Sequence, residues 1–140
     1  MIGIVVVSHS PALARAAVEL AAQMLRGQGP VIAIAAGASD GSLGTDATRV
    51  AAALAEAASP DGTLVLMDLG SAVMSAQLAQ ELSPSHGANV RLCGAPLVEG
   101  LVAAVVRAAA GADLDTVVHE AEIALLPKLV QLGRAGPSVS

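Results

Sequence analysis

The stretch Ile2-Gly3-Ile4-Val5-Val6-Val7-Ser8-His9-Ser10-Pro11 decides the fold. Residues 2–7 form an apolar run rich in β-branched side chains, which is typical of a strand buried on both faces. Pro11 suits the first turn of a helix, and Ser10 is its candidate N-cap. A buried strand that leads directly into a helix predicts the opening unit of an α/β domain.

The alternation of strands and helices continues along the chain. Further strands are predicted at residues 31–36, 63–67 and 89–93, and helices at 12–26, 47–58, about 72–82, 96–110 and 114 to about 126. Strands joined by helices favour a single domain with a mainly parallel four-stranded sheet and helices on both faces. We assign this domain to residues 1–132 and expect residues 133–140 to form a flexible tail.

Composition and charge narrow the functional classes. The chain has 140 residues, no aromatic side chain, and a net charge of −5. Few cations and no stacking aromatics argue against nucleic-acid binding. No apolar run reaches the roughly 18 residues of a spanning helix, and the start lacks the basic region of a signal peptide. With one cysteine, and therefore no internal disulfide, a cytoplasmic protein is expected.

Three polar segments follow three predicted strands. His9 follows the first strand, a loop rich in Gly, Ser and Asp covers residues 37–46, and Asp68-Leu69-Gly70-Ser71 follows the third strand. Ligands bind at the carboxyl ends of parallel strands, because these ends lie at one edge of the sheet. We therefore expect His9, the loop and Asp68 to Ser71 to lie on one rim.

His9 is the best candidate for chemistry. A neutral imidazole is a good nucleophile near pH 7 when a carboxylate fixes its tautomer, and Asp68 is the natural partner. Ser71 and the first amides of its helix could then hold a phosphoryl group. As alternatives, His9 caps the helix, and Asp68 binds a metal or serves in a turn. No metal-ligand spacing is present, and no metal site is predicted.

The glycine loop does not match a nucleotide motif. Gly37, Gly41 and Gly44 precede a helix, but no lysine follows, so ATP binding is not expected. These glycines are predicted to adopt positive φ in a turn, or to form a small rim loop that lets a protein partner approach His9 closely.

The remaining singled-out residues have mostly structural interpretations. We expect surface positions for His86 and His119, and a buried position for Cys93. Arg49 lies near the predicted rim, either as part of a solvated helix face or as a guide for an anionic partner. Three methionines are predicted to fill core gaps: Met24, Met67 and Met74.

Several motifs together resemble the phosphotransferase subunits of PEP-dependent dihydroxyacetone kinases, which are similar to mannose-type IIA domains of the sugar phosphotransferase system. The resemblance covers about residues 3 to 122. It is carried by Gly3–Ser10, Leu13-Ala14, Gln23-Met24, Asp40-Gly41, Gly44-Thr45, Asp68-Leu69-Gly70-Ser71-Ala72 with Met74, and Ala95-Pro96-Leu97-Val98-Glu99-Gly100. The chain departs from the family pattern at Ala38, Ser75 and Gln77.

The resemblance implies a function for the site. His9 would be phosphorylated by a phosphohistidine carrier protein, Asp68 would orient its ring, and Ser71 would contact the phosphoryl group. The group would then pass to ADP on a partner kinase subunit, for phosphorylation of dihydroxyacetone. The resemblance also implies a homodimer, for which the apolar helix 97–110 is a candidate interface, and it implies no cofactor.

Two other functions stay open at this point. The same crevice could bind a nucleotide or a phosphorylated metabolite without any covalent step. Alternatively, Asp68 and His9 could act as acid and base in a hydrolase that needs no protein donor.

Overall fold

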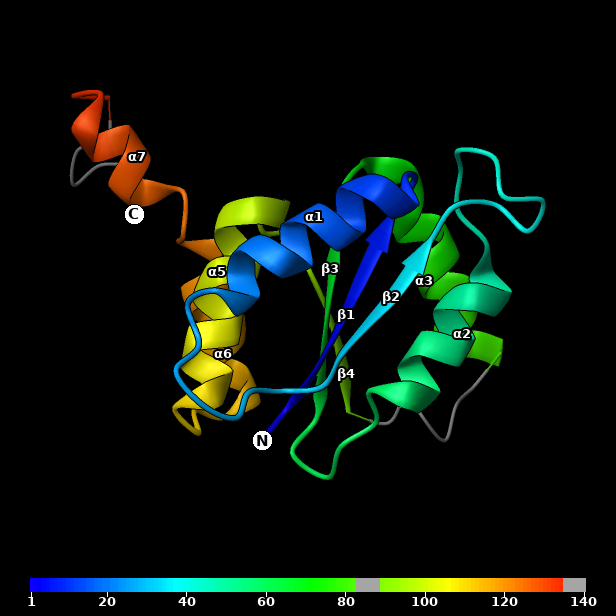
Figure 1. The fold of residues 1–140 in the computed structure, drawn as a ribbon, viewed down its shortest axis with the longest axis horizontal. Coiled ribbons are helices and arrows are strands. Elements are labelled where there is room, and N and C mark those ends of the chain that lie inside the picture. The colour runs from blue at the N-terminus through cyan, green and yellow to red at the C-terminus, as the bar shows by residue number, and fades with distance from the viewer. Residues whose placement is uncertain (83–88, 135–140) are drawn as a thin grey trace.

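The computed structural model describes residues 1–82 and 89–134. The chain alternates strands and helices as predicted, with helices covering both faces of one sheet (Figure 1). The elements are β1 (Gly3–Ser8), α1 (Pro11–Ala22), β2 (Ile32–Ala36), α2 (Ala47–Glu56), β3 (Thr63–Met67), α3 (Gly70–Leu82), β4 (Val90–Cys93), α5 (Leu97–Ala109), α6 (Leu114–Glu122) and α7 (Leu126–Gln131).

The predicted parallel sheet is confirmed. Its strand order is β2-β1-β3-β4, and every pair is parallel. The chain runs from β1 outward to β2 and returns to β3 on the other side of β1, so the strand order reverses between β1 and β3. In open α/β sheets this switch point leaves a crevice at the carboxyl ends of the two strands. His9 follows β1 and Asp68 follows β3, so the topology brings both residues to this crevice.

Two hydrophobic clusters hold the layers together. One joins alternate residues of β1 and β3 to small side chains of α1, α5 and α6, and the other joins the remaining strand residues to α2 and α3. All six residues of β1 are buried, as predicted for a strand covered on both faces. Alanine is the commonest buried residue of the helices, which lets helices without aromatic residues pack closely on the sheet.

Local capping explains where the helices begin. The Ser10 side chain accepts a hydrogen bond from the Leu13 N–H at 3.2 Å, which confirms Ser10 as the N-cap of α1. Of the two predicted caps for α2, Thr45 and Asp46, the structure selects Asp46, whose carboxylate accepts from the Thr48 N–H at 3.0 Å. Such caps satisfy backbone donors that the first helical turn leaves without partners.

Two predicted helix ends are wrong. The first helix ends at Ala22 rather than Arg26, because tight turns to Met24 and Leu25 swing the Leu25 side chain toward the core. The predicted helix from Leu114 to about Leu126 ends at Glu122, and α7 is a separate helix. Pro127 lacks an N–H and is tolerated only in a first helical turn, so it starts a new helix instead of extending α6.

The methionine prediction is also wrong in part. Met67 packs against the core, but Met24 is 51% exposed and Met74 is 72% exposed. Met24 lies in the turn after α1, and Met74 lies on an outward-facing position of α3, a distinction that apolar character alone does not reveal. The predicted loop at residues 83–87 and most of the predicted tail, residues 135–140, lie outside the described residues.

Gly3 sets how closely α2 approaches the sheet. A Cβ atom on this residue would lie 1.9 Å from the Ala57 carbonyl oxygen, which is a backbone atom that cannot move aside cheaply. We expect Gly3→Ala to destabilise the protein by about 2 kcal/mol or more, measured by chemical denaturation. Gly27→Ala is the matched control, since no atom lies within 4 Å of the added carbon. Equal stability of the two variants would contradict this packing.

None of the described helices combines the length and the apolar composition that crossing a bilayer requires.

Candidate functional site

The predicted rim forms at the carboxyl ends of the strands. The Gly44 N–H donates to the His9 carbonyl at 3.0 Å, and the Gly37 N–H donates to the Ser8 carbonyl at 3.1 Å, so the loop 37–46 lies against the His9 segment. The predicted positive φ is confirmed for Gly37, Gly41 and Gly44. Asp68 meets His9 directly, so all three predicted segments converge.

Asp68 is the centre of the site. One carboxylate oxygen accepts from His9 Nδ1 at 2.9 Å and from the Leu69 N–H at 2.7 Å. The other accepts from the His9 N–H at 2.9 Å and from Ser8 Oγ at 3.0 Å. Four donors therefore fix both oxygens, and the carboxylate cannot rotate without breaking several hydrogen bonds at once.

These hydrogen bonds keep Asp68 ionised. Burial of the side chain, which is only 8% exposed, raises the pKa, but the hydrogen bonds from His9, Ser8 and Leu69 outweigh burial. The net pKa of Asp68 lies below its ordinary value of 3.8. A carboxylate can only accept hydrogen bonds, so His9 Nδ1 must carry the proton in this pair. Of the two ring nitrogens, Nε2 is then the one with a free lone pair.

Ser71 lies at the other side of the ring. Its hydroxyl contacts His9 Nε2 and can donate to the lone pair on that nitrogen. The structure starts α3 at Gly70, two residues before the predicted start, so Ser71 belongs to the first turn of this helix. Within the described residues, the Gly70 and Ser71 N–H groups donate to no acceptor. Such helix ends favour anions.

The His9 ring is accessible from outside. Its side chain is 24% exposed, and the exposed portion is compatible with approach to Nε2, since Nδ1 faces the buried carboxylate. This arrangement does not match the alternative that His9 merely caps α1, because the Ser10 side chain makes that hydrogen bond. A nucleophilic nitrogen held in one tautomer at a surface can exchange a group with a protein-sized partner.

Ser8 is a site residue that the sequence interpretation did not single out. It is fully buried, and its hydroxyl bonds Asp68 and accepts from the Ser10 N–H at 3.1 Å. A polar side chain at the end of a buried strand nearly always has a hydrogen-bond partner. The serine just before His9 was therefore the sequence feature from which a role in the site could have been inferred.

Removal of the Ser8 hydroxyl tests its contribution. For the phosphoryl group that the family resemblance predicts on His9, we expect Ser8→Ala to lower the transfer rate about tenfold, because the carboxylate beside the ring loses one of its four donors. The matched control is Ser42→Ala, which removes a serine hydroxyl from the exposed carboxylate of Asp40. Equal rates for both variants would remove Ser8 from the site.

The described residues among those singled out on other grounds form none of the hydrogen bonds around His9 and Asp68. His119 is exposed on α6 as predicted, and His86 lies outside the described residues. Cys93 is buried as predicted, and burial raises the pKa of its thiol. Arg49 lies in the first turn of α2. Among the described residues, no three His, Cys, Asp or Glu side chains group as ligands for a metal ion.

All three departures from the family pattern can be placed. The Ser75 hydroxyl bonds Thr45 Oγ1 at 2.6 Å and thereby ties α3 to the loop 37–46. Ala38 lies in that loop, and its N–H donates to the Ser42 carbonyl at 2.9 Å. Gln77 is exposed on α3, away from the hydrogen bonds of the site.

Comparisons with known proteins find relatives that match most of this chain. The chain is 51% identical over 136 residues to the phosphoryl donor subunit DhaM of the PEP-dependent dihydroxyacetone kinase of Escherichia coli, covering 95% of this chain and 29% of the relative. The chain thus spans less than a third of that relative's length. It is 32% identical to the DhaM subunit of the PEP-dependent dihydroxyacetone kinase 2 of Listeria innocua, covering 86% of this chain and 96% of the relative.

A solved structure and a family description extend the comparison. A crystal structure of EF1359, a protein of unknown function, superposes with a TM-score of 0.75 at 33% identity, covering 87% of this chain and 94% of the other. Residues 3–118 match the family described as "EIIA-man: PTS system fructose IIA component". With this match over most of its length, the chain belongs to the EIIA-man family.

Proposed function

We propose that this chain is a phosphohistidine relay, in which His9 accepts a phosphoryl group from a phosphohistidine carrier protein and passes it to ADP on a partner kinase subunit. The final acceptor of the phosphoryl group is dihydroxyacetone. One observation carries the proposal: Asp68 holds the proton on Nδ1, so the lone pair of Nε2 points outward. The DhaM relatives, which act as phosphoryl donor subunits, support the choice of substrate.

The geometry suits both transfer steps. The Nε2 lone pair forms a bond to phosphorus while the bond from phosphorus to the donor's histidine breaks. In the second step, a β-phosphate oxygen of ADP forms the new bond and the bond to Nε2 breaks. The proton stays on Nδ1 throughout, and Asp68 stabilises the positive charge that the ring gains. Ser71 and the free amides of α3 can hold the phosphoryl oxygens.

The absence of strong phosphate ligands fits a relay. Among the described residues, no lysine or arginine hydrogen-bonds His9, Asp68 or Ser71. Serine hydroxyls and amides hold an anion more weakly than a cation clamp, so the phosphoryl group keeps its tendency to move on. Loose phosphoryl transition states mainly require in-line positioning, which a partner protein can supply at an exposed ring.

The alternative functions fit the site less well. The cavity beside Asp68 measures about 190 Å³, below the roughly 300 Å³ at which small-molecule sites begin. A hydrolase would need Asp68 to give up or take a proton, but four donors occupy its oxygens and keep it ionised. Binding of a small molecule without a covalent step also makes no use of the accessible lone pair on Nε2.

A homodimer is part of the same proposal. The helix suggested as its interface, α5, buries Leu101, Ala104 and Val105 inside the chain. Only its outer side remains available, where Val98 and Val102 line an apolar groove of about 830 Å³ shared with α6 and α7. Sedimentation equilibrium of the full chain tests this assembly.

The relay is tested by reconstitution. The chain is incubated with phosphoenolpyruvate, the first enzyme of the phosphotransferase system and the carrier protein. We expect a gain of one acid-labile, base-stable phosphate, followed by its transfer to ADP when the kinase subunit is added. No gain with the complete donor system would refute the relay. Because ADP is kept in the cytoplasm, the proposal also places the chain there.

A further inference from the structure

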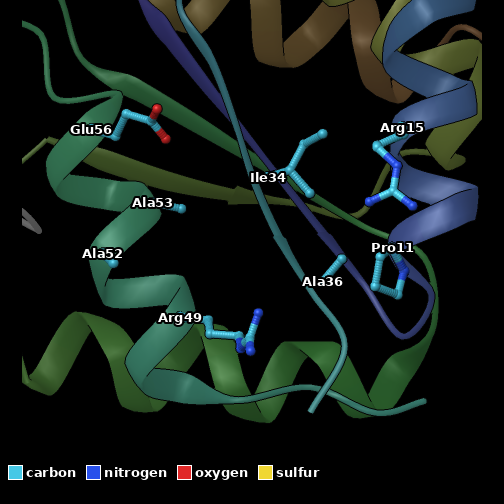
Figure 2. A pocket seen from close by; sticks show the side chains of 8 residues that line it. All are labelled: Pro11, Arg15, Ile34, Ala36, Arg49, Ala52, Ala53 and Glu56. Atoms are coloured by element: carbon cyan, nitrogen blue, oxygen red, sulfur yellow. The ribbon is translucent and has the colours of Figure 1, made fainter. Parts of the chain in front are cut away.

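An open groove runs along the free edge of the sheet. Its volume is about 580 Å³, and side chains from α1, β2 and α2 line it (Figure 2). Ile34 and Ala36 of β2 form the floor. Arg15 extends from α1 on one side, and Arg49 and Glu56 extend from α2 on the other. No part of the proposed relay uses this groove.

The floor of the groove offers unpaired backbone groups. β2 ends the sheet, with β1 as its neighbour. The Ile4 N–H donates to the Val31 carbonyl and the Gly37 N–H donates to the Ser8 carbonyl, so the odd-numbered residues 31–37 face β1. In a parallel ladder the groups of residues 32, 34 and 36 then point outward. Such an edge can pair with an extended segment of another protein.

Arg15 and Arg49 line opposite walls of the groove and make it cationic toward the start of α1 and α2, the arginine end (Figure 2). Among the described residues, neither Arg15 nor Arg49 forms an ion pair, whereas three of the other five cations do: Arg91 with Asp115, Arg107 with Glu120 and Lys128 with Glu99. Glu56 lies seven residues from Arg49, about 10 Å along α2, at the opposite end. The groove therefore favours carboxylates at the arginine end, in a chain whose net charge is −5.

The arginine end adjoins the His9 site. Pro11 lines the groove and is two residues from His9, and Arg15 follows one turn later on α1. Arg49 lies in the first turn of α2, directly after the loop whose Gly44 bonds His9. A protein positioned over His9 can therefore place a segment in this groove at the same time.

We propose that the groove docks an extended, acidic segment of the protein that holds ADP. This inference rests on the proposed relay and adds a partner surface to it. Charge selects the ADP-bound partner rather than the carrier. When the carrier docks, the two proteins share one phosphoryl group, but when ADP docks, its diphosphate meets a phosphorylated His9. The repulsion is larger in the second step, and carboxylate–arginine contacts made in the groove, away from His9, offset it by holding the ADP-bound partner in place.

The test compares the two half-reactions. The variant Arg15→Glu/Arg49→Glu raises the KM for the ADP-loaded kinase subunit about tenfold or more, and changes the KM for the phosphorylated carrier by less than about twofold. The control, Arg26→Glu/Arg134→Glu, makes the same change in net charge at exposed residues outside the groove and leaves both KM values within about twofold. A third variant, Ile34→Pro, removes an outward N–H from the edge strand, where proline is tolerated, and also weakens docking of the kinase subunit.

Three outcomes would overturn the proposal: unchanged KM for the kinase subunit in the first variant, an equal rise in the control, or a rise confined to the carrier. Calorimetric titration of the unphosphorylated chain with the ADP-loaded kinase subunit measures docking without phosphoryl transfer. It therefore separates the groove proposal from the relay. If wild type binds the kinase subunit but never gains phosphate, the relay fails. If it gains phosphate and the groove variant binds equally well, the groove proposal alone fails.

Discussion

His9→Ala leaves the chain without any acid-labile phosphate after incubation with the complete donor system. The expected effect is complete loss rather than a slower rate, because the variant lacks the atom that bonds to phosphorus. Around the deleted ring, Asp68 keeps the hydrogen bonds from Ser8, from the Leu69 N–H and from the backbone N–H of residue 9. The ring is partly exposed and absent from both hydrophobic clusters, so the variant should fold.

The matched control is His119→Ala, which removes an exposed imidazole from α6. We expect this variant to gain one phosphate at the wild-type rate. Intact-mass spectrometry under basic conditions measures the gain, and circular dichroism confirms the fold of both variants. A phosphate retained on His9→Ala would place the acceptor elsewhere and would remove His9 from the mechanism.

The fold could be predicted because one signal dominated each element. The continuous apolar run before Ser8 needs burial on both faces, which a central strand of a covered sheet provides, and all of β1 is buried in this way. Once strands alternate with helices, crossover rules leave few topologies. Helix ends were harder, because Ala22 to Arg26 has helical propensity throughout and only tertiary contacts of Leu25 end the helix early.

The site could be predicted as a set of residues but not as a network. The rule that functional groups gather at strand carboxyl ends brought His9 and Asp68 together. The rule could not show which donors surround the Asp68 carboxylate. The set of donors depends on the register between β1 and β3, which pairs Val7 with Met67, 60 residues later in the sequence. Ser8 was missed for that reason, and the earlier start of α3, which places Ser71 in a helical turn, was missed because Gly70 favours a turn.

Exposure of apolar side chains was the least predictable property. Met74 shares its helix with buried Ala72 and Ala76, so composition places it near the core while helical geometry turns it outward. The arginines of the β2 groove show the same limit. Arg15 and Arg49 are 34 residues apart in the sequence, and only the fold brings them to one groove.

Asp68→Asn replaces one carboxylate oxygen by an amide nitrogen, which donates hydrogen bonds instead of accepting them. Neither orientation of the amide keeps all the hydrogen bonds of the site. All four neighbours of the carboxylate are hydrogen-bond donors: His9 Nδ1, the His9 N–H, the Leu69 N–H and Ser8 Oγ. If the amide faces the ring, Nδ1 must accept and Nε2 must carry the proton, which is the wrong tautomer for attack on phosphorus. If the amide faces the other way, the partly buried His9 N–H loses its acceptor.

The charge also links Asp68 to stability. Its folded pKa lies below the ordinary value of 3.8, so its contribution is fully present above that value and is lost as the pH falls through the folded pKa. The Asn variant has no group to titrate there. The stability difference between wild type and Asp68→Asn, measured by denaturation, should therefore shrink as the pH is lowered below about 4.

The rate of phosphoryl transfer is the decisive measurement on Asp68→Asn. We expect a fall of up to about four orders of magnitude, the effect of replacing an orienting carboxylate by an amide that favours the wrong histidine tautomer. Nitrogen NMR of the ring should show the proton shared between Nδ1 and Nε2, instead of held on Nδ1. Asp113→Asn is the matched control, because it loses the same charge at a helix N-cap where asparagine serves equally well. If Asp68→Asn transfers at the wild-type rate, the carboxylate does not orient the ring, and the outward lone pair of Nε2 must have another cause.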